Sequence, residues 1–128
     1  MITTTRFGTR DLARAKAFWG GIVSLIGAKQ IYDRPNMVAF KGDDGGTLLI
    51  GVPFEGDHEV GNGNMAGFHV ASRALVDAVH AKALQLGGAN EGAPGVRGDD
   101  ANGFYGAYFR DLDGNKVTVF RFGPPDTL

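Results

Sequence analysis

The chain of 128 residues contains no cysteine, no run of basic residues and no long apolar stretch. The absence of cysteine excludes disulfides, thiolate metal sites and cysteine nucleophiles, and it is typical of proteins from a reducing cytoplasm. A formal net charge of −1 without a basic run argues against nucleic acid or an anionic membrane surface as a partner. No stretch approaches the roughly 20 apolar residues of a membrane span, and the polar N-terminal MITTTRFGTRDL is unlike a signal peptide. We therefore expect a cytoplasmic protein.

Length and glycine content indicate the type of fold. A chain of 128 residues is long enough for one hydrophobic core but not for two. The 21 glycines fall mostly in clusters that resemble turns, which is typical of short strands joined by tight connections. We therefore expect a single domain of short strands and few helices.

Two segments have the apolar periodicity of helices, residues 11–26 and 72–86. Asp11 and Ser72 are candidate N-caps, and glycines follow each segment at the place where a helix ends. One constant offset aligns the two segments and pairs Asp11 with Ser72, Phe18 with Val79, Trp19 with His80 and Gly27 with Gly88. The alignment indicates an internal duplication.

The flanks of the two helices repeat as well. A short strand precedes each helix, at residues 3–8 and 65–71, and three more strands follow each one, at 28–32, 37–41 and 47–52 and at about 89–91, 104–110 and 116–122. The linker of residues 54–64 is rich in Gly and Asn. We predict an α+β domain of two βαβββ modules, residues 1–57 and 64–123, whose strands form a curved mixed sheet.

The last two predicted strands form a hairpin that shows which residues share a face. We expect Asp113-Gly114 to be a two-residue turn in which both residues have positive φ. Because side chains alternate along a strand, Val117 and Val119 face the helices while Thr118 and Phe120 face the other way. Tyr108, opposite Thr118, lies on that second face.

Three stretches of sequence resemble the vicinal-oxygen-chelate superfamily, which includes glyoxalases, bleomycin-resistance proteins and extradiol dioxygenases. They are DLDGNKVTVFRF in the hairpin, DLARAKAFW in the first helix and SRALVDAVHAKALQLGGANEGAPGVR in the second module. The resemblance covers nearly the whole chain and implies the fold of paired βαβββ modules. It also implies a homodimer, because these proteins commonly complete their cavities by pairing.

The resemblance also implies where a metal would bind. Metal-dependent members place His, Glu or Gln side chains at four strand positions, which correspond here to Thr4, Leu49 (or Thr47), Met65 and Thr118. These side chains cannot form a site for a divalent metal, because threonine hydroxyls are weak ligands and a thioether suits Cu(I). We therefore predict no metal ligands and no cofactor, with a divalent metal only under an alternative interpretation in which the site is displaced or degenerate.

The histidines do not restore such a site. His69 lies four residues beyond Met65, roughly 13 Å along an extended strand, so it cannot replace Met65 as a ligand. It shares the face of Met65 and is either a residue that lines the cavity or a structural histidine. We expect His80 to pack under the rim of the sheet, and His58 with Glu59 to be a solvated pair.

The residues on the face opposite the helices are the candidate binding site. The predicted ligand-binding residues are Arg6, Trp19 at the rim, Leu49, Met65, His69, Tyr108, Thr118 and Phe120. This mixture of aromatic, apolar and polar groups indicates a metal-free pocket for a small aromatic or amphipathic molecule. The alternatives are a glyoxalase-like lyase or isomerase or a dioxygenase-related enzyme, with His69 as general base and Arg6 stabilising charge, and a scaffold that acts only through interactions.

Overall fold

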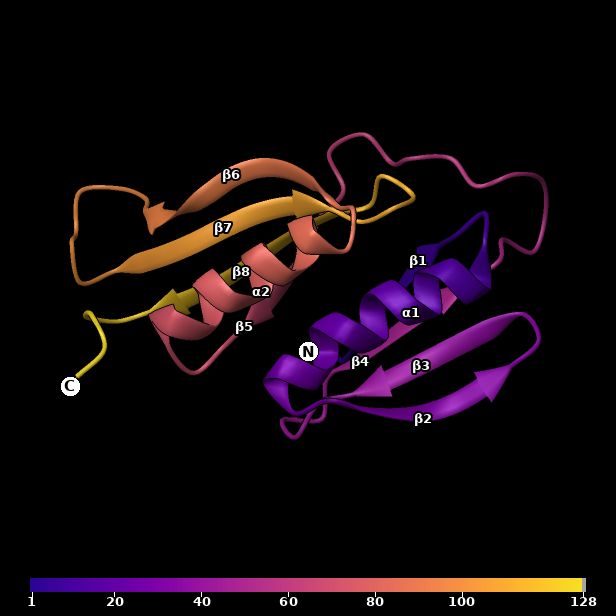
Figure 1. The fold of residues 1–128 in the computed structure, drawn as a ribbon, viewed down its shortest axis with the longest axis horizontal. Helices are drawn as coiled ribbons and strands as arrows, with labels where there is room; N and C mark the ends of the chain where they lie inside the picture. The colour runs from indigo at the N-terminus through magenta and orange to yellow at the C-terminus, as the bar shows by residue number, and fades with distance from the viewer. Residues whose placement is uncertain (128) are drawn as a thin grey trace.

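The computed structural model describes residues 1–127 and contains the predicted repeat (Figure 1). The first half consists of β1 (Thr4–Gly8), α1 (Leu12–Val23), a short 3₁₀ helix (Ser24–Ile26), β2 (Lys29–Arg34), β3 (Met37–Lys41) and β4 (Thr47–Gly51). The second half consists of β5 (Ala66–His69), α2 (Arg73–Gln85), β6 (Ala89–Val96), β7 (Phe104–Arg110) and β8 (Lys116–Phe122). The order of strand, helix and three strands, twice, is confirmed.

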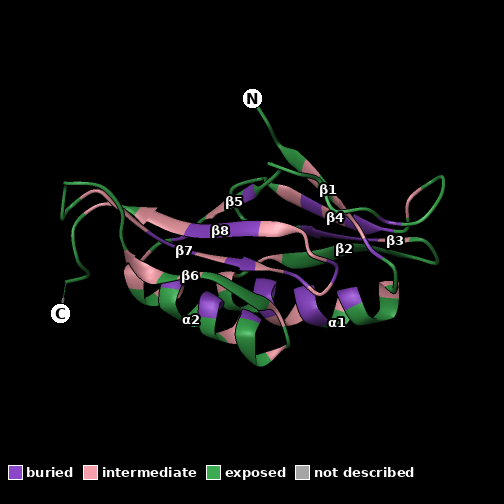
Figure 2. Cartoon of the chain, turned by 90° about the horizontal axis from the view of Figure 1, so that it is seen from above, coloured by how far each residue is buried: buried purple, intermediate pink, exposed green. Residues whose placement is uncertain are grey.

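Each half forms one four-stranded mixed sheet. The strand orders are β1-β4-β3-β2 and β5-β8-β7-β6, in which β1 pairs with β4, and β5 with β8, in parallel. Both helices cover the same side of the sheets and leave the other side free of helices (Figure 2). The predicted α+β class is therefore correct. We call the side away from the helices the open face.

The strand register of the two sheets is equivalent position by position. Arg6 lies opposite Leu49 in the first sheet, and Gly67 lies opposite Thr118 in the second. Since Arg6 and Gly67 are 61 positions apart, as are the caps Asp11 and Ser72, Leu49 and Thr118 occupy equivalent places. The duplication inferred from the helices thus extends through the strands.

The helix ends follow the capping residues read from the sequence. The Asp11 side chain accepts a hydrogen bond from the amide of Arg14, and the Ser72 side chain accepts one from that of Leu75. The chain leaves the helices at Gly27 (φ 75°) and Gly87 (φ 100°), a conformation that glycine adopts at little cost. The first helix is shorter than predicted, because its last turn tightens to 3₁₀ geometry at Ser24.

One hydrophobic core joins the two modules, and Trp19 lies at its centre. The indole is fully buried, and its ring centroid lies 5.9 Å from that of Phe7, 5.6 Å from Phe68 and 6.2 Å from Phe109. Phe7 belongs to the first module, whereas the other two rings belong to the second. The prediction that Trp19 caps the rim of a cavity is therefore wrong, because the apolar stripe of α1 turns this side chain towards both sheets.

The turn between β7 and β8 differs from the predicted two-residue turn. The last paired residues are Arg110 and Lys116, so the loop has five residues, and within it the amide of Gly114 donates to the carbonyl of Asp111. Gly114 has a φ of 87°, whereas no non-glycine residue of the described chain, Asp113 included, has a positive φ. The extra residues turn both aspartate side chains inward.

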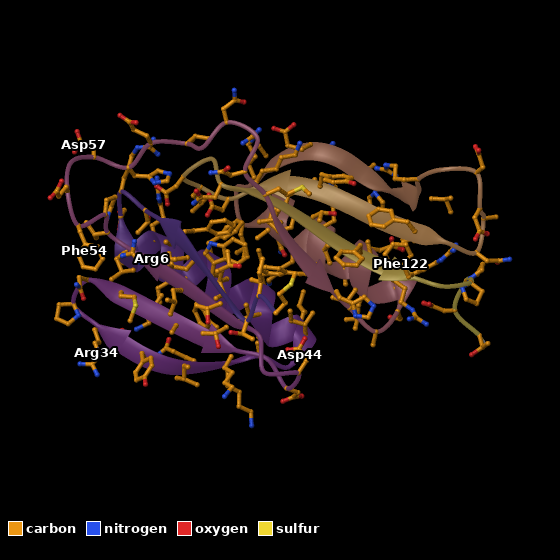
Figure 3. All side chains as sticks on the ribbon, turned by 180° about the vertical axis from the view of Figure 1, so that it is seen from behind. Arg6, Arg34, Asp44, Phe54, Asp57 and Phe122 are labelled. Atoms are coloured by element: carbon orange, nitrogen blue, oxygen red, sulfur yellow. The ribbon has the colours of Figure 1, made fainter. Side chains whose placement is uncertain are left out.

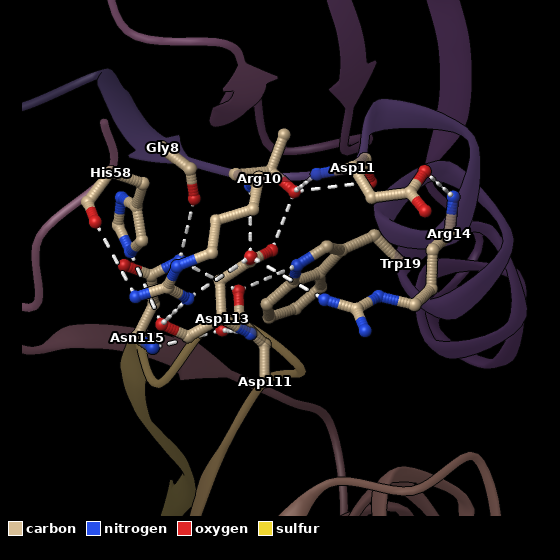
Figure 4. A network of polar contacts seen from close by, with 10 residues as sticks. Gly8, Arg10, Asp11, Arg14, Trp19, His58, Asp111, Asp113 and Asn115 are labelled. Carbon is tan, nitrogen blue, oxygen red and sulfur yellow. Dashed lines mark hydrogen bonds and ion pairs between the residues drawn. The ribbon is translucent and has the colours of Figure 1, made fainter. Parts of the chain in front are cut away.

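Those two aspartates tie the turn to the first module (Figure 4). Buried Asp113 accepts hydrogen bonds from the Thr9 hydroxyl (2.5 Å) and the Arg10 amide (2.9 Å). Buried Asp111 accepts one from the Trp19 indole (3.2 Å), and Asn115 Nδ2 donates to the carbonyl of Gly8 (2.9 Å). Burial raises the pKa of Asp111, against the hydrogen bonds that favour its charged form. We call this set of contacts the turn clamp.

The turn clamp leads to a prediction for stability. Replacing Asp113 with Ala removes the partner of a buried hydroxyl and of a backbone amide, so we expect the free energy of unfolding to fall by about 2–4 kcal/mol. Urea denaturation followed by tryptophan fluorescence measures the loss. The matched control is Asp57→Ala in the exposed linker, which should change stability little. Equal stability of the two variants would show that the clamp does not hold the modules together.

Tyr105 provides a second prediction, for alkaline pH. Its hydroxyl donates to Asp77 on α2 (2.6 Å), and this bond is the main reason that the pKa of Tyr105 rises to about 12. Because the folded pKa lies above the ordinary value of 10.0, the contribution of this bond to stability is complete below pH 10 and is lost towards pH 12. Absorbance at the phenolate band should show an ionisation near pH 12 that is absent in Tyr105→Phe. A titration unchanged by that substitution would contradict the assignment.

Candidate functional site

The open face holds most of the residues predicted to bind a ligand. Paired residues of neighbouring strands share a face, and the register places Arg6 and Leu49 on the open face of the first sheet. It places His69, Tyr108, Thr118 and Phe120 on the open face of the second sheet. Val117 and Val119 are fully buried towards the helices, so the predicted alternation along β8 is confirmed.

A crevice separates the two sheets on this side. Strands β1 and β5 each pair on one edge only, and between their free edges lies a hollow of about 460 Å³. Thr4, Met65, Gly67 and His69 line it from the two strands, and core residues such as Phe68 form its apolar floor. The volume lies within the range of small-molecule pockets.

A second hollow of about 380 Å³ continues along β1 under the linker. It is lined by Arg6, Gly8, His58, Met65 and Lys116, among others. Met65, half exposed, lines both hollows, whereas Arg6 and His69 line different ones. The structure therefore does not bring the two residues of the enzymatic alternative into one pocket.

Arg6 is already engaged by its own module. Its guanidinium donates to the carbonyl of Val52 (3.0 Å) and lies over the ring of Phe54, 5.2 Å from the centroid. Arg6 and Phe54 lie at one end of the open face, and Phe122 lies at the opposite end (Figure 3).

Four rings form a cluster on the second sheet next to the crevice. Phe120 is 5.4 Å from His69 and 5.9 Å from Phe122, centroid to centroid, and it stacks on Phe104 at 5.5 Å. Phe122 is 59% exposed, so the cluster opens to solvent. We call His69, Phe104, Phe120 and Phe122 the ring cluster. The sequence prediction missed Phe104 and Phe122, although both follow the alternation already used for Tyr108 and Phe120.

Two cations lie close to the ring of Tyr108. Arg97 and Lys116 each place their charged group 5.7 Å from the centre of its ring. Neither was predicted. Lys116 lies two residues before Thr118 on β8, so the alternation along the strand could have placed it on the open face. Nothing in the sequence indicates that Arg97, just beyond β6, folds back over Tyr108.

The four strand positions at which the family resemblance implies metal ligands do not fit a divalent ion. The Thr118 hydroxyl is buried and donates to the carbonyl of Ala107 (3.2 Å), while Leu49 and Met65 offer no hard ligand. Within residues 1–127 no three His, Asp or Glu side chains lie close enough to hold a metal ion.

The other two histidines are structural. His80 is buried and its Nε2 lies 3.0 Å from Asn90 Oδ1, in agreement with the expected packing under the sheet. His58 is only 9% exposed, its Nε2 lies 3.1 Å from the carbonyl of Asp113, and its ring lies over Gly8. The prediction of a solvated pair with Glu59 is therefore wrong, because the linker folds back onto the turn clamp.

Comparison with known proteins shows the family. The model of the Glyoxalase/Bleomycin resistance protein/Dioxygenase superfamily matches residues 2–119, so the chain belongs to this superfamily. No curated protein matches the chain in sequence.

No helix among the described residues is long and apolar enough to cross a membrane.

Solved structures agree with this assignment. A glyoxalase/bleomycin resistance protein from Albidiferax ferrireducens T118 is 29% identical, with a TM-score of 0.85 over 94% of this chain and 98% of that one. A lactoylglutathione lyase from Agrobacterium tumefaciens is 25% identical, with a TM-score of 0.69 over 94% and 92% of the two chains. The hypothetical protein SA1046 from S. aureus is 23% identical, with a TM-score of 0.69 over 94% and 96%, and shows the fold alone.

Proposed function

We propose that this protein binds a small aromatic or amphipathic molecule on its open face without a metal ion. The observation that carries the proposal is the ring cluster beside the 460 Å³ crevice. Aromatic side chains that remain exposed in a folded monomer usually serve recognition, because their burial would otherwise stabilise the core. A ligand packed against His69 and Phe120 would cover this apolar surface.

The chemistry of the four strand positions supports binding without metal. Thr4, Leu49, Met65 and Thr118 supply hydroxyls, an alkyl group and a thioether, and the Thr118 hydroxyl already donates to a backbone carbonyl. A catalytic divalent ion needs about three imidazole or carboxylate ligands and an open position. A metal-dependent lyase reaction therefore has no ligand set at these four positions.

Metal content tests the first half of the proposal. Protein purified without chelator should contain far less than one equivalent of Zn, Ni, Fe or Mn per chain by mass spectrometry, and calorimetric titration with Ni²⁺ or Zn²⁺ should show no tight site. Near one equivalent that survives dialysis, with a spectroscopic signature of nitrogen and oxygen ligands, would defeat the metal-free assignment.

Two substitutions test the second half. A panel of aromatic compounds screened by fluorescence should yield a ligand whose affinity falls about tenfold in His69→Ala and in Tyr108→Ala, because each removes a ring from the face. The melting temperature should stay nearly unchanged. Tyr32→Ala is the matched control, since Tyr32 is also a tyrosine beside an arginine but lies on the first sheet.

The opposite pattern would assign these residues to the core. If both substitutions lower the melting temperature sharply and no compound of the panel binds the parent protein, the pocket interpretation is wrong.

The homodimer stays a prediction, and analytical sedimentation measures the mass of the particle in solution directly.

A further inference from the structure

Three aromatic side chains of the second sheet lean over glycines. A Cβ on Gly67 would lie 3.2 Å from the Phe120 ring, one on Gly92 would lie 3.1 Å from the Tyr108 ring, and one on Gly106 would lie 2.5 Å from the Phe104 ring. A Cβ at any of these positions would press on the ring beside it. The missing side chains therefore leave room for each of the three rings to lie over the sheet.

One end of this surface is cationic. Arg97 folds back along β6, where its guanidinium donates to the carbonyl of Ala93 (2.7 Å) and lies over Tyr108. Lys116 reaches the same ring from β8. The nearby Glu91 forms its ion pair with Arg110 (2.5 Å) and with neither of them. Two positive groups from different strands thus converge on one phenol, and neither forms an ion pair among the described residues.

The rest of the open face carries the same sign of charge. The whole chain has a formal net charge of −1. Within the described strands, however, the positions that the register turns to the open face include Arg6, Lys29, Arg34, Lys41 and Lys116. The acidic Glu91, at the bulge of β6, forms an ion pair with Arg110 of the same face. The positive potential of this face attracts anions and disfavours cations.

We infer that the ligand of the open face is an aromatic anion, with its acidic group at Arg97 and Lys116 and its ring against Phe120 and Phe104. Phe120 lies two residues beyond Thr118, which pairs with Tyr108. The cationic end at Tyr108 and the aromatic end at Phe120 are therefore about 7 Å apart along the strand. A fused two-ring compound with one carboxylate or sulfonate spans that distance. The inference rests on the proposed function and adds the charge and orientation of the ligand.

Two fluorescent probes of the same shape separate charge from ring stacking. The first is 1-anilinonaphthalene-8-sulfonate, an aromatic anion, and the second is N-phenyl-1-naphthylamine, the same skeleton without the sulfonate. The parent protein should bind the sulfonate at least about tenfold more tightly, at one site per chain, and added salt should weaken that binding alone.

Charge-removing variants locate the acidic group. Arg97→Gln and Lys116→Gln should each weaken sulfonate binding about three- to tenfold and leave binding of the neutral probe unchanged, in proteins with the parent's circular dichroism spectrum and melting temperature. Lys41→Gln, on the open face of the first sheet, and Lys82→Gln, on α2, are the matched controls and should bind both probes as the parent does.

The outcomes distinguish this inference from the proposed function. Equal affinity for both probes, or equal losses in Lys41→Gln and Lys116→Gln, overturns the inference while the proposed function stands. Failure of both probes to bind overturns both. Displacement of the sulfonate by single-stranded oligothymidylate at lower concentration than by 2-naphthoate would instead assign the face to nucleic acid and overturn the small-molecule inference.

Discussion

The turn clamp is the contact on which the arrangement of the two modules depends. Of the two buried aspartates of the β7–β8 turn, Asp113 accepts hydrogen bonds from the junction between β1 and α1, and Asp111 accepts one from the Trp19 indole at the centre of the shared core. Polar contacts and hydrophobic burial therefore meet at one place. Because β1 and β5 do not pair with each other, no ladder of backbone hydrogen bonds joins the sheets within residues 1–127. The clamp and the core therefore hold together the two modules that border the crevice.

Much of the fold could be predicted from the sequence because local signals agreed with the duplication. Asp11 and Ser72 cap their helices as predicted, and the alternation along β8 is correct because one side of that strand is buried. The predictions failed where long-range contacts decide the conformation. Trp19 lies in the core because α1 packs on both modules, and His58 is buried because the linker folds back onto the turn, which no local pattern encodes.

The candidate site was predictable in part for the same reason. The alternation of side chains along β7 and β8 identified Tyr108, Thr118 and Phe120 as residues of the open face. The same alternation also places Phe104, Phe122 and Lys116 there, although the prediction did not include them. Arg97 lies outside the regular strand, and its approach to Tyr108 depends on bulges in β6 that no local sequence pattern predicts. Arg6 and His69 line different hollows because of the gap between the free edges of β1 and β5. That gap results from how the two modules pack, which the sequence of neither strand indicates.

The duplicated register has a consequence for stoichiometry. At the positions equivalent to His69 and Phe120, the first module has Gly8 and Gly51. The space over Gly8 is filled by His58 from the linker, and a side chain on Gly51 would meet the guanidinium of Arg6. The first sheet therefore has no counterpart of the ring cluster, although its backbone repeats that of the second. Under the proposed function, a chain built from two copies of one unit would thus offer one site rather than two, and a ligand of the ring cluster would saturate at a single molecule per chain.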